Sequence, residues 1–135
     1  MADVTDIREA VRAKLSGDAT LTGMLGSGDR IFYQQVRDDQ VVPVVIFSDT
    51  GTRPDPLVPL HERALRVTCK HTTFEAAEGI LERIRVLLHG KPLTIPGTGW
   101  RFMGCYVGAD DEAPVADGDV VERSLTFRLL AYEVA

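Results

Sequence analysis

The residues that could carry chemistry are few and widely spaced along this chain. Cys69 and His71 are two positions apart, which places a thiol and an imidazole near the end of a predicted strand. A catalytic cysteine–histidine pair or a metal site would need further ligands, and the other histidines, His61 and His89, do not supply metal-ligand spacing. We therefore interpret Cys69 as a core residue and expect it and Cys105 to be reduced. The sequence predicts no catalytic and no metal-binding residue.

The strongest local charge is a run of acids late in the chain. Residues 109–122 hold six acids and no base: Asp110, Asp111, Glu112, Asp117, Asp119 and Glu122. Their spacing lacks the alternating ligands, central glycine and closing glutamate of an EF-hand loop. We interpret the first five acids either as a solvated hairpin tip or as a loop that contacts a partner or lines a channel.

Composition and glycine spacing argue against several protein classes. The net charge is −5, and removing the six acids leaves the rest of the chain at +1, so the basic face of a general nucleic-acid-binding protein is not expected. The glycine clusters at 26–28 and 97–99 lack the lysine of a phosphate loop and the dinucleotide pattern, so they predict turns and no cofactor. No apolar run approaches the roughly 20 residues of a membrane helix. We expect a protein made in a cytoplasm and not bound to a membrane.

Two amphipathic helices are the clearest elements of the sequence. The first is predicted to be capped by Asp6, and its apolar stripe consists of Val4, Ile7, Val11 and Leu15. The second is predicted to begin with a capping box of Thr72 and Glu75 and to stop at Gly90. Its apolar stripe consists of Phe74, Ala77, Leu81, Ile84 and Leu88, widened by Ile80 and Leu87. Between them, Asp18 can cap a short helix that is predicted to bury Leu21, Met24 and Leu25.

Apolar and alternating runs predict the strands. Strands are expected over residues 30–33, 41–48, 60–70, 100–108 and 121–134. Pro43 cannot donate a backbone hydrogen bond, so it should lie at the start of its strand or on an edge. Trp100, Phe102 and Tyr106 are expected on one face of their strand, with Cys105 on the other. The last two strands flank the acidic segment as a long hairpin would.

The order helix, strands, helix, strands is not the strict alternation of a parallel α/β fold. It predicts a single α+β domain over residues 1–135, with an antiparallel or mixed β-sheet, two main helices packed on one face, and long hairpin loops. The loops at 50–59 and 109–119 are long for a compact domain. We expect them to become ordered on assembly with a partner.

Four segments in this order resemble a known family. They are an N-terminal helix followed by DATLTGML and GDRIFY; then VPVVIFSDTG; then HERALRVTCKH running into TTFEAAEGILERIRVLLHG; and the closing segment GWRFMGCYVGADDEAPVADGDVVERSLTFRLLAYEV. Over residues 4–134 the chain resembles the tail-completion family of long-tailed bacteriophages and prophages, which are tail terminators or tail-to-head joining proteins. One departure is VTCKH, where family members more commonly have an aromatic residue and a serine.

The resemblance implies a structural virion protein without enzymatic activity or cofactor, assembled in the host cytoplasm. Members form a ring, expected to be a hexamer, on the end of the tail tube. The ring stops tube polymerisation and offers a surface to the head connector, while DNA passes through the lumen without sequence-specific binding. The implied partners are further copies of the chain, the tail tube protein and a connector or neck protein. The alternatives are a head-completion protein of the neck and a small-molecule-binding α+β domain, for which the sequence shows no convergent polar residues.

A closed ring needs two different patches on each copy. One is predicted on the second main helix, where small residues allow close approach: Ala76, Gly79, Arg83 and Val86. The alternative is a plain solvated helix face. Arg53 and Asp55, in the first long loop, are predicted to contact another copy or the tube. The acidic segment is predicted to face either the lumen, where its charge would keep DNA from adhering, or the tail tube.

Overall fold

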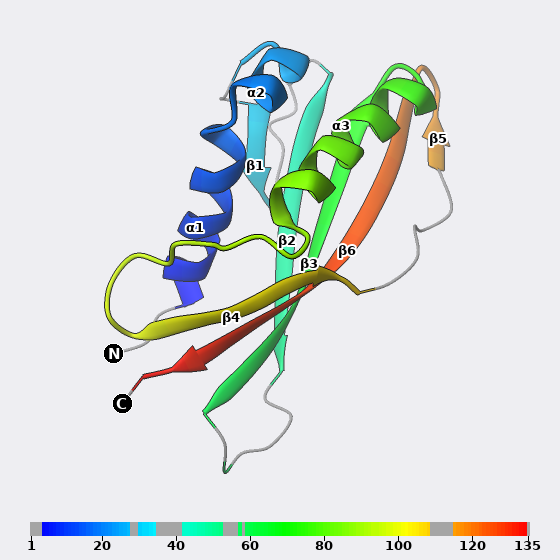
Figure 1. Ribbon diagram of the computed structural model, residues 1–135. Helices are drawn as coiled ribbons and strands as arrows, with labels where there is room; N and C mark the ends of the chain where they lie inside the picture. Colours follow the sequence, from blue (N-terminus) through cyan, green and yellow to red (C-terminus); the bar gives the residue numbers. More distant parts are fainter. Residues whose placement is uncertain are drawn as a thin grey trace.

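The computed structural model describes residues 4–27, 30–34, 42–52, 57, 59–108 and 115–134 as helices and one mixed β-sheet (Figure 1). The helices are α1 (Val4–Ser16), α2 (Ala19–Leu25) and α3 (Phe74–Leu88). The strands are β1 (Ile31–Tyr33), β2 (Val44–Thr52), β3 (Leu60–His71), β4 (Trp100–Val107), β5 (Val115–Asp117) and β6 (Val120–Glu133). In the described part of the chain, every helix is too short or too polar to cross a membrane.

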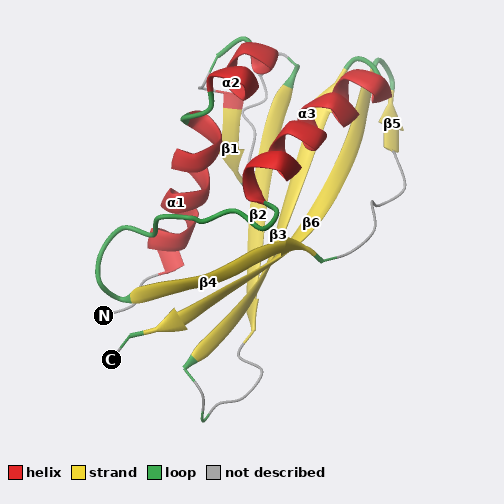
Figure 2. Cartoon of the chain, viewed as in Figure 1, coloured by secondary structure: helices red, strands yellow, loops and turns green. Residues whose placement is uncertain are grey.

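The sheet runs in the order β1-β2-β3-β6-β4, and β5 pairs separately with the start of β6. β1 and β2 are parallel, whereas the other pairs are antiparallel. Figure 2 shows α1 and α3 on the same face of the twisted sheet, with α3 packed over β3 and β6 and α1 beside β1. The predicted α+β architecture, a mixed sheet with two main helices on one face, is confirmed.

The first helix buries the predicted stripe but begins earlier than expected. Ile7, Val11 and Leu15 are buried, as their spacing predicts. The helix already includes Val4, so Asp6 lies inside its first turn and the prediction that it caps the helix is wrong. In that position the carboxylate still favours the helix, because the first turn carries the positive end of the helix dipole.

The third helix is capped one residue later than predicted. Thr73 has the extended conformation of a capping residue, with φ −135° and ψ 151°, and its hydroxyl accepts a hydrogen bond from the Ala76 amide at 3.2 Å. The capping box of Thr72 and Glu75 is therefore wrong. The predicted stop is confirmed, because the helix ends at Leu88 and Gly90 has a φ of 67°, which suits glycine.

The short helix α2 packs against α3 rather than wholly into the core. Its predicted cap is confirmed: Asp18 Oδ2 accepts a hydrogen bond from the Leu21 amide at 2.9 Å. Leu21 and Leu25 are buried, but Met24, predicted to be buried with them, is 40% exposed. Phe74, in the first turn of α3, is likewise more exposed than its place in the predicted stripe indicates.

Strand boundaries correct two expectations about loops. The strand predicted over residues 41–48, with Pro43 at its start, begins directly after Pro43 and continues to Thr52, so the first long loop starts later than residue 50. β4 and β6 pair as the predicted hairpin. The segment between them is more than a loop, because residues 115–117 form β5 and turn back into β6 at Gly118.

A β-bulge in β4 overturns the predicted alternation of its side chains. The pairing with β6 shifts between Phe102 and Gly104, so one residue drops out of the alternation. Cys105 then joins Trp100 and Phe102 in the hydrophobic core, whereas Tyr106 turns to the opposite, exposed face. Simple alternation had placed Tyr106 with the other aromatic residues and Cys105 apart from them.

Candidate functional site

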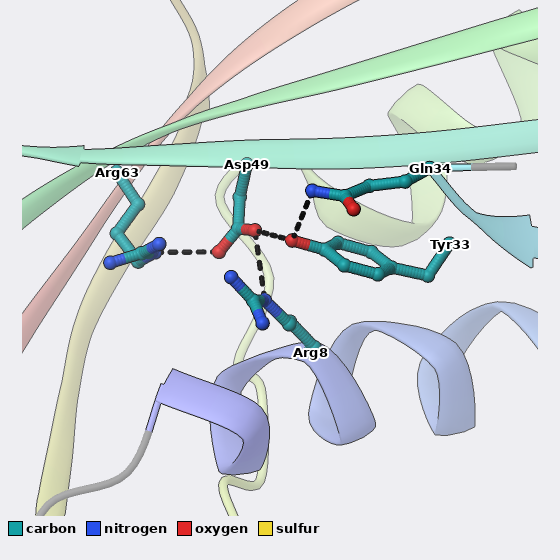
Figure 3. Close-up of polar contacts among 5 residues, drawn as sticks. All are labelled: Arg8, Tyr33, Gln34, Asp49 and Arg63. Carbon is teal, nitrogen blue, oxygen red and sulfur yellow. Dashed lines mark hydrogen bonds and ion pairs between the residues drawn. The ribbon is translucent and has the colours of Figure 1, made fainter.

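The most concentrated polar cluster that the structure describes is an ion network centred on Asp49 (Figure 3). Asp49 Oδ1 accepts hydrogen bonds from the Tyr33 hydroxyl at 2.6 Å and from Arg8 Nε at 3.0 Å. Its Oδ2 accepts one from Arg63 Nε at 2.6 Å. Gln34 extends the network by donating from Nε2 to the Tyr33 hydroxyl at 3.2 Å. Residues from β1, β2 and β3 and from α1 thus meet at one carboxylate.

Burial and charge set the protonation state of this network. The side chain of Asp49 is 3% exposed and that of Arg63 is 8% exposed. Burial alone would raise the pKa of Asp49, but the hydrogen bonds from Tyr33 and Arg63, together with the Arg63 charge, lower the pKa below its ordinary value. The pKa of Tyr33 is raised, because its hydroxyl is partly buried and donates to the carboxylate. Asp49 is therefore ionised and Tyr33 protonated at neutral pH.

Gly51 makes room for the network. It lies opposite Arg63 in the pairing of β2 with β3, and a Cβ at this position would collide with the Arg63 guanidinium. Arg8 also lies over the Tyr33 ring, with its guanidinium carbon 4.5 Å from the ring centroid. Through Arg8 and Asp49 the network connects α1 directly to the sheet.

The residues of this network were not predicted to form a site, although Asp49 and Arg63 each leave a signal in their own strand. Asp49 shares the inward face of β2 with Val45 and Phe47. Arg63 likewise shares the inward face of β3 with Leu65. A charge that interrupts the apolar alternation of a strand could have indicated a buried charged group that needs a partner, although not which partner it has.

The predicted patch on α3 is divided between internal contacts and exposed surface. Arg83 binds Asp18 in two hydrogen bonds, Nε to Oδ2 at 2.9 Å and Nη2 to Oδ1 at 2.8 Å. The hydrogen bonds from Arg83 and from the α2 backbone lower the pKa of Asp18 to about 2. A Cβ on Gly79 would lie 3.7 Å from Met24 of α2. Ala76 is half-buried, whereas Gly79 and Val86 are exposed, Val86 to 47%.

The other predicted contact residues lie mostly outside the described part of the chain. Arg53 and Asp55, and the acids Asp110, Asp111 and Glu112, fall outside the described residues. Asp117 belongs to β5, and Asp119 is exposed at the turn that leads into β6. Their predicted roles against another copy, the lumen or the tube stay predictions.

Cys69 is a core residue, as predicted, and the bulge in β4 brings Cys105 into the core as well. Cys69 and Cys105 are both buried and both free thiols. Burial raises the pKa of each thiol to about 12, so neither is a thiolate near neutral pH. The imidazole of His71 accepts a hydrogen bond from the Thr72 amide at 2.8 Å. In the described residues there is also no group of three His, Cys, Asp or Glu side chains that could hold a metal ion.

A groove of about 340 Å³ lies between α3 and the first half of β6. Its lining mixes two apolar side chains with charged ones: Leu81, Leu125, Glu78, Glu82, Arg85 and Arg123, beside Gly79. Arg123 Nη2 lies 3.0 Å from Glu78 Oε1, so one of these charges is bridged across the groove. The groove thus presents charges of both signs beside two apolar side chains.

Comparison with known proteins supplies the family. The family model described as "Tail completion protein gp17" matches residues 9–132. The fold is similar to that of a chain in the solved structure described as the virion of a native gene transfer agent particle, with a TM-score of 0.74, 16% sequence identity and 92% of each chain covered. A second solved structure, described only by a sequence identifier, has a TM-score of 0.62 at 10% identity and covers 100% of this chain and 98% of that one. At these identities the structural likeness concerns the fold alone, and no curated protein sequence matches the chain.

Proposed function

This chain belongs to the tail completion protein gp17 family, and we propose that it is the tail terminator of a phage-like particle. In this role, copies of the chain form a hexameric ring on the end of the tail tube, stop its polymerisation and join the tail to the head connector. The observation that carries the proposal is the extent of the family match. Residues 9–132 include parts or all of every helix and strand described, so the match concerns the whole domain and not a local motif.

The shape and chemistry of the domain support a structural role. A head-to-tail ring needs two different surfaces on each copy. The sheet supplies them, because one of its faces is covered by α1 and α3 and the opposite face carries polar and aromatic side chains of β3, β4 and β6. The Asp49 network ties α1 to three strands, which gives the domain a rigid frame on which neighbours can pack.

Mixing the purified protein with tail tubes that lack a terminator tests the proposal. We expect a ring near six copies of the 14.8 kDa chain on tube ends, and we expect added protein to halt growth of tubes from purified tube subunits. Native mass spectrometry and electron microscopy of tube ends measure both. Binding only to tube-free heads would instead identify a head-completion protein of the neck. Binding to neither tubes nor heads would overturn the proposal and favour a small-molecule-binding domain.

A further inference from the structure

The face of the sheet opposite the described helices carries aromatic and basic side chains where β4 pairs with β6. Arg101 lies opposite Tyr132, and Tyr106 lies opposite Arg128, all four on this outer face. We call these four residues the Arg–Tyr patch. All four side chains are exposed, Tyr106 to 46%. Arginine and tyrosine are enriched in protein–protein interfaces, where a broad apolar ring or a flat cation contributes much of the binding energy.

The patch is held in place by its surroundings. The Tyr106 ring lies across Gly104, where a Cβ would come within 2.5 Å of the ring, and it meets the His89 ring edge-on at a centroid distance of 5.8 Å. Arg128 Nε lies 2.6 Å from Glu62 Oε1 on β3. The bulge in β4 is what turns Tyr106 to this face. A surface ordered before binding loses less conformational entropy on association.

A surface rich in acids lies on the other side of the molecule. Its sign is opposite to that of Arg101, which supplies the net charge of the patch because Arg128 is paired with Glu62. Glu75, Glu78 and Glu82 are exposed along α3, and we call them the α3 acidic face. Glu78 and Glu82 border the groove of about 340 Å³ between α3 and β6, and Glu78 is paired with Arg123 at 3.0 Å. Val86 is exposed one helical turn after Glu82. Arg85 is the one base on this stretch of α3 besides Arg83, which is bound to Asp18. The face therefore presents acids, an exposed valine and a hollow.

We propose that the Arg–Tyr patch of one copy binds the α3 acidic face of the next copy. The inference rests on the proposed ring and names the surfaces that close it. Because the patch and α3 lie on opposite faces of the sheet, this contact joins copies head to tail and not as a two-fold pair. The opposite charges fix which surfaces meet, since like charges brought together in an interface are strongly unfavourable.

Single charge reversals test each surface separately. Glu82→Lys and Arg101→Glu are the suitable changes, because both side chains are exposed and neither takes part in the ion pairs described above. Each variant alone should weaken ring formation by roughly 100-fold, as like charges then face each other at every contact. Glu9→Lys on α1 is the matched control for Glu82→Lys, because it makes the same charge change on an exposed helix position outside both surfaces.

An equimolar mixture of the two variants provides the decisive test. In a head-to-tail ring, Lys at 82 of one variant would meet Glu at 101 of the other, and the unchanged surfaces would meet at the alternate contacts. Rings should therefore reappear with equal numbers of both variants in strict alternation, which a hexamer allows. Native mass spectrometry resolves the composition, because the variants differ in mass.

The outcomes separate this inference from the proposed function. If the unchanged protein forms no ring on tubes or heads, the terminator role fails and the inference fails with it. If the unchanged protein forms rings and either variant does so equally well, or the mixture does not restore them, the inference alone is overturned. If Arg101→Glu abolishes binding of duplex DNA while Glu82→Lys leaves rings intact, the Arg–Tyr patch is a DNA-contacting surface instead.

Discussion

Replacing Asp49 by asparagine tests whether the buried ion network holds α1 on the sheet. Asparagine keeps the shape but leaves the Arg63 guanidinium, which is 8% exposed, without its counter-charge. Breaking a buried ion pair by removing one partner costs about 3–5 kcal/mol. Typical domains have roughly 5–15 kcal/mol of stability in total. For a domain of this size we expect Tm to fall by about 10–20 °C, at roughly 3–5 °C per kcal/mol.

Urea unfolding followed by circular dichroism measures this cost, with an unchanged m-value confirming that the same surface is exposed. Glu122→Gln is the control, because it removes a carboxylate that pairs with Lys70 at 3.1 Å with both side chains about a third exposed. Exposed ion pairs of this kind stabilise the folded protein by only about 0–1 kcal/mol. An Asp49→Asn cost below about 1 kcal/mol, equal to that of the control, would refute the reasoning.

The dependence on pH gives a second check on the same residue. The pKa of Asp49 is lowered in the folded protein, so between the folded and unfolded pKa values the unfolded chain binds more protons. The stability that the ionised Asp49 carboxylate contributes is therefore complete above its pKa in the unfolded chain, about 3.9. It is lost as the pH falls through its lower pKa in the folded protein. The difference in stability between the unchanged protein and Asp49→Asn should shrink below about pH 4. A difference that stays constant down to pH 2 would contradict an ionic origin.

Three further outcomes follow from the described contacts. Gly51→Ala should lower the free energy of unfolding in urea by about 1–3 kcal/mol, because the new Cβ displaces the Arg63 guanidinium. An unchanged urea midpoint would show instead that the Arg63 side chain moves aside freely. Cys69 should resist a thiol reagent at pH 8 until urea unfolds the chain, because burial raises its pKa to about 12; fast labelling of the native protein would argue against a buried thiol. Asp18→Asn should loosen α2 and speed its amide hydrogen exchange at neutral pH. Because the pKa of Asp18 is about 2, the difference in exchange between the variant and the unchanged protein should fade only as the pH falls from about 4 towards 2. If the two proteins exchange equally fast at pH 7, the bond between Asp18 and Arg83 does not stabilise α2.

The predictable part of the fold is the part governed by local periodicity. The stripe of Ile7, Val11 and Leu15 requires a helix with one buried side, and the alternation around Val67 requires a strand with one buried face. Local rules were less reliable at element ends. Thr72 and Thr73 are both competent capping residues, and the final backbone path decides which of them takes the extended conformation.

The contacts of the candidate sites depend on tertiary structure and were not predicted. The place of Arg83 in an interface stays a prediction, whereas its bond to Asp18, 65 positions away in the chain, was not foreseen. Asp49 was not singled out: its inward position on an apolar strand face was a signal, but its partners come from three other elements, so the sequence near it does not identify them. Tyr106 was placed on the wrong face, because a single bulge reverses the alternation of every residue after it.

By itself, the sequence determined the α+β class, the two amphipathic helices, the long strands, the reduced cysteines and the resemblance to tail-completion proteins. Each of these depends on composition or on spacing within one segment, where burial of one face leaves a repeating pattern. Only the tertiary structure decided the strand order, the ion network at Asp49 and the placement of the Arg–Tyr patch and the α3 acidic face on opposite sides of the sheet. These depend on which segments meet in space, and the energy of such contacts is shared by residues far apart in the chain.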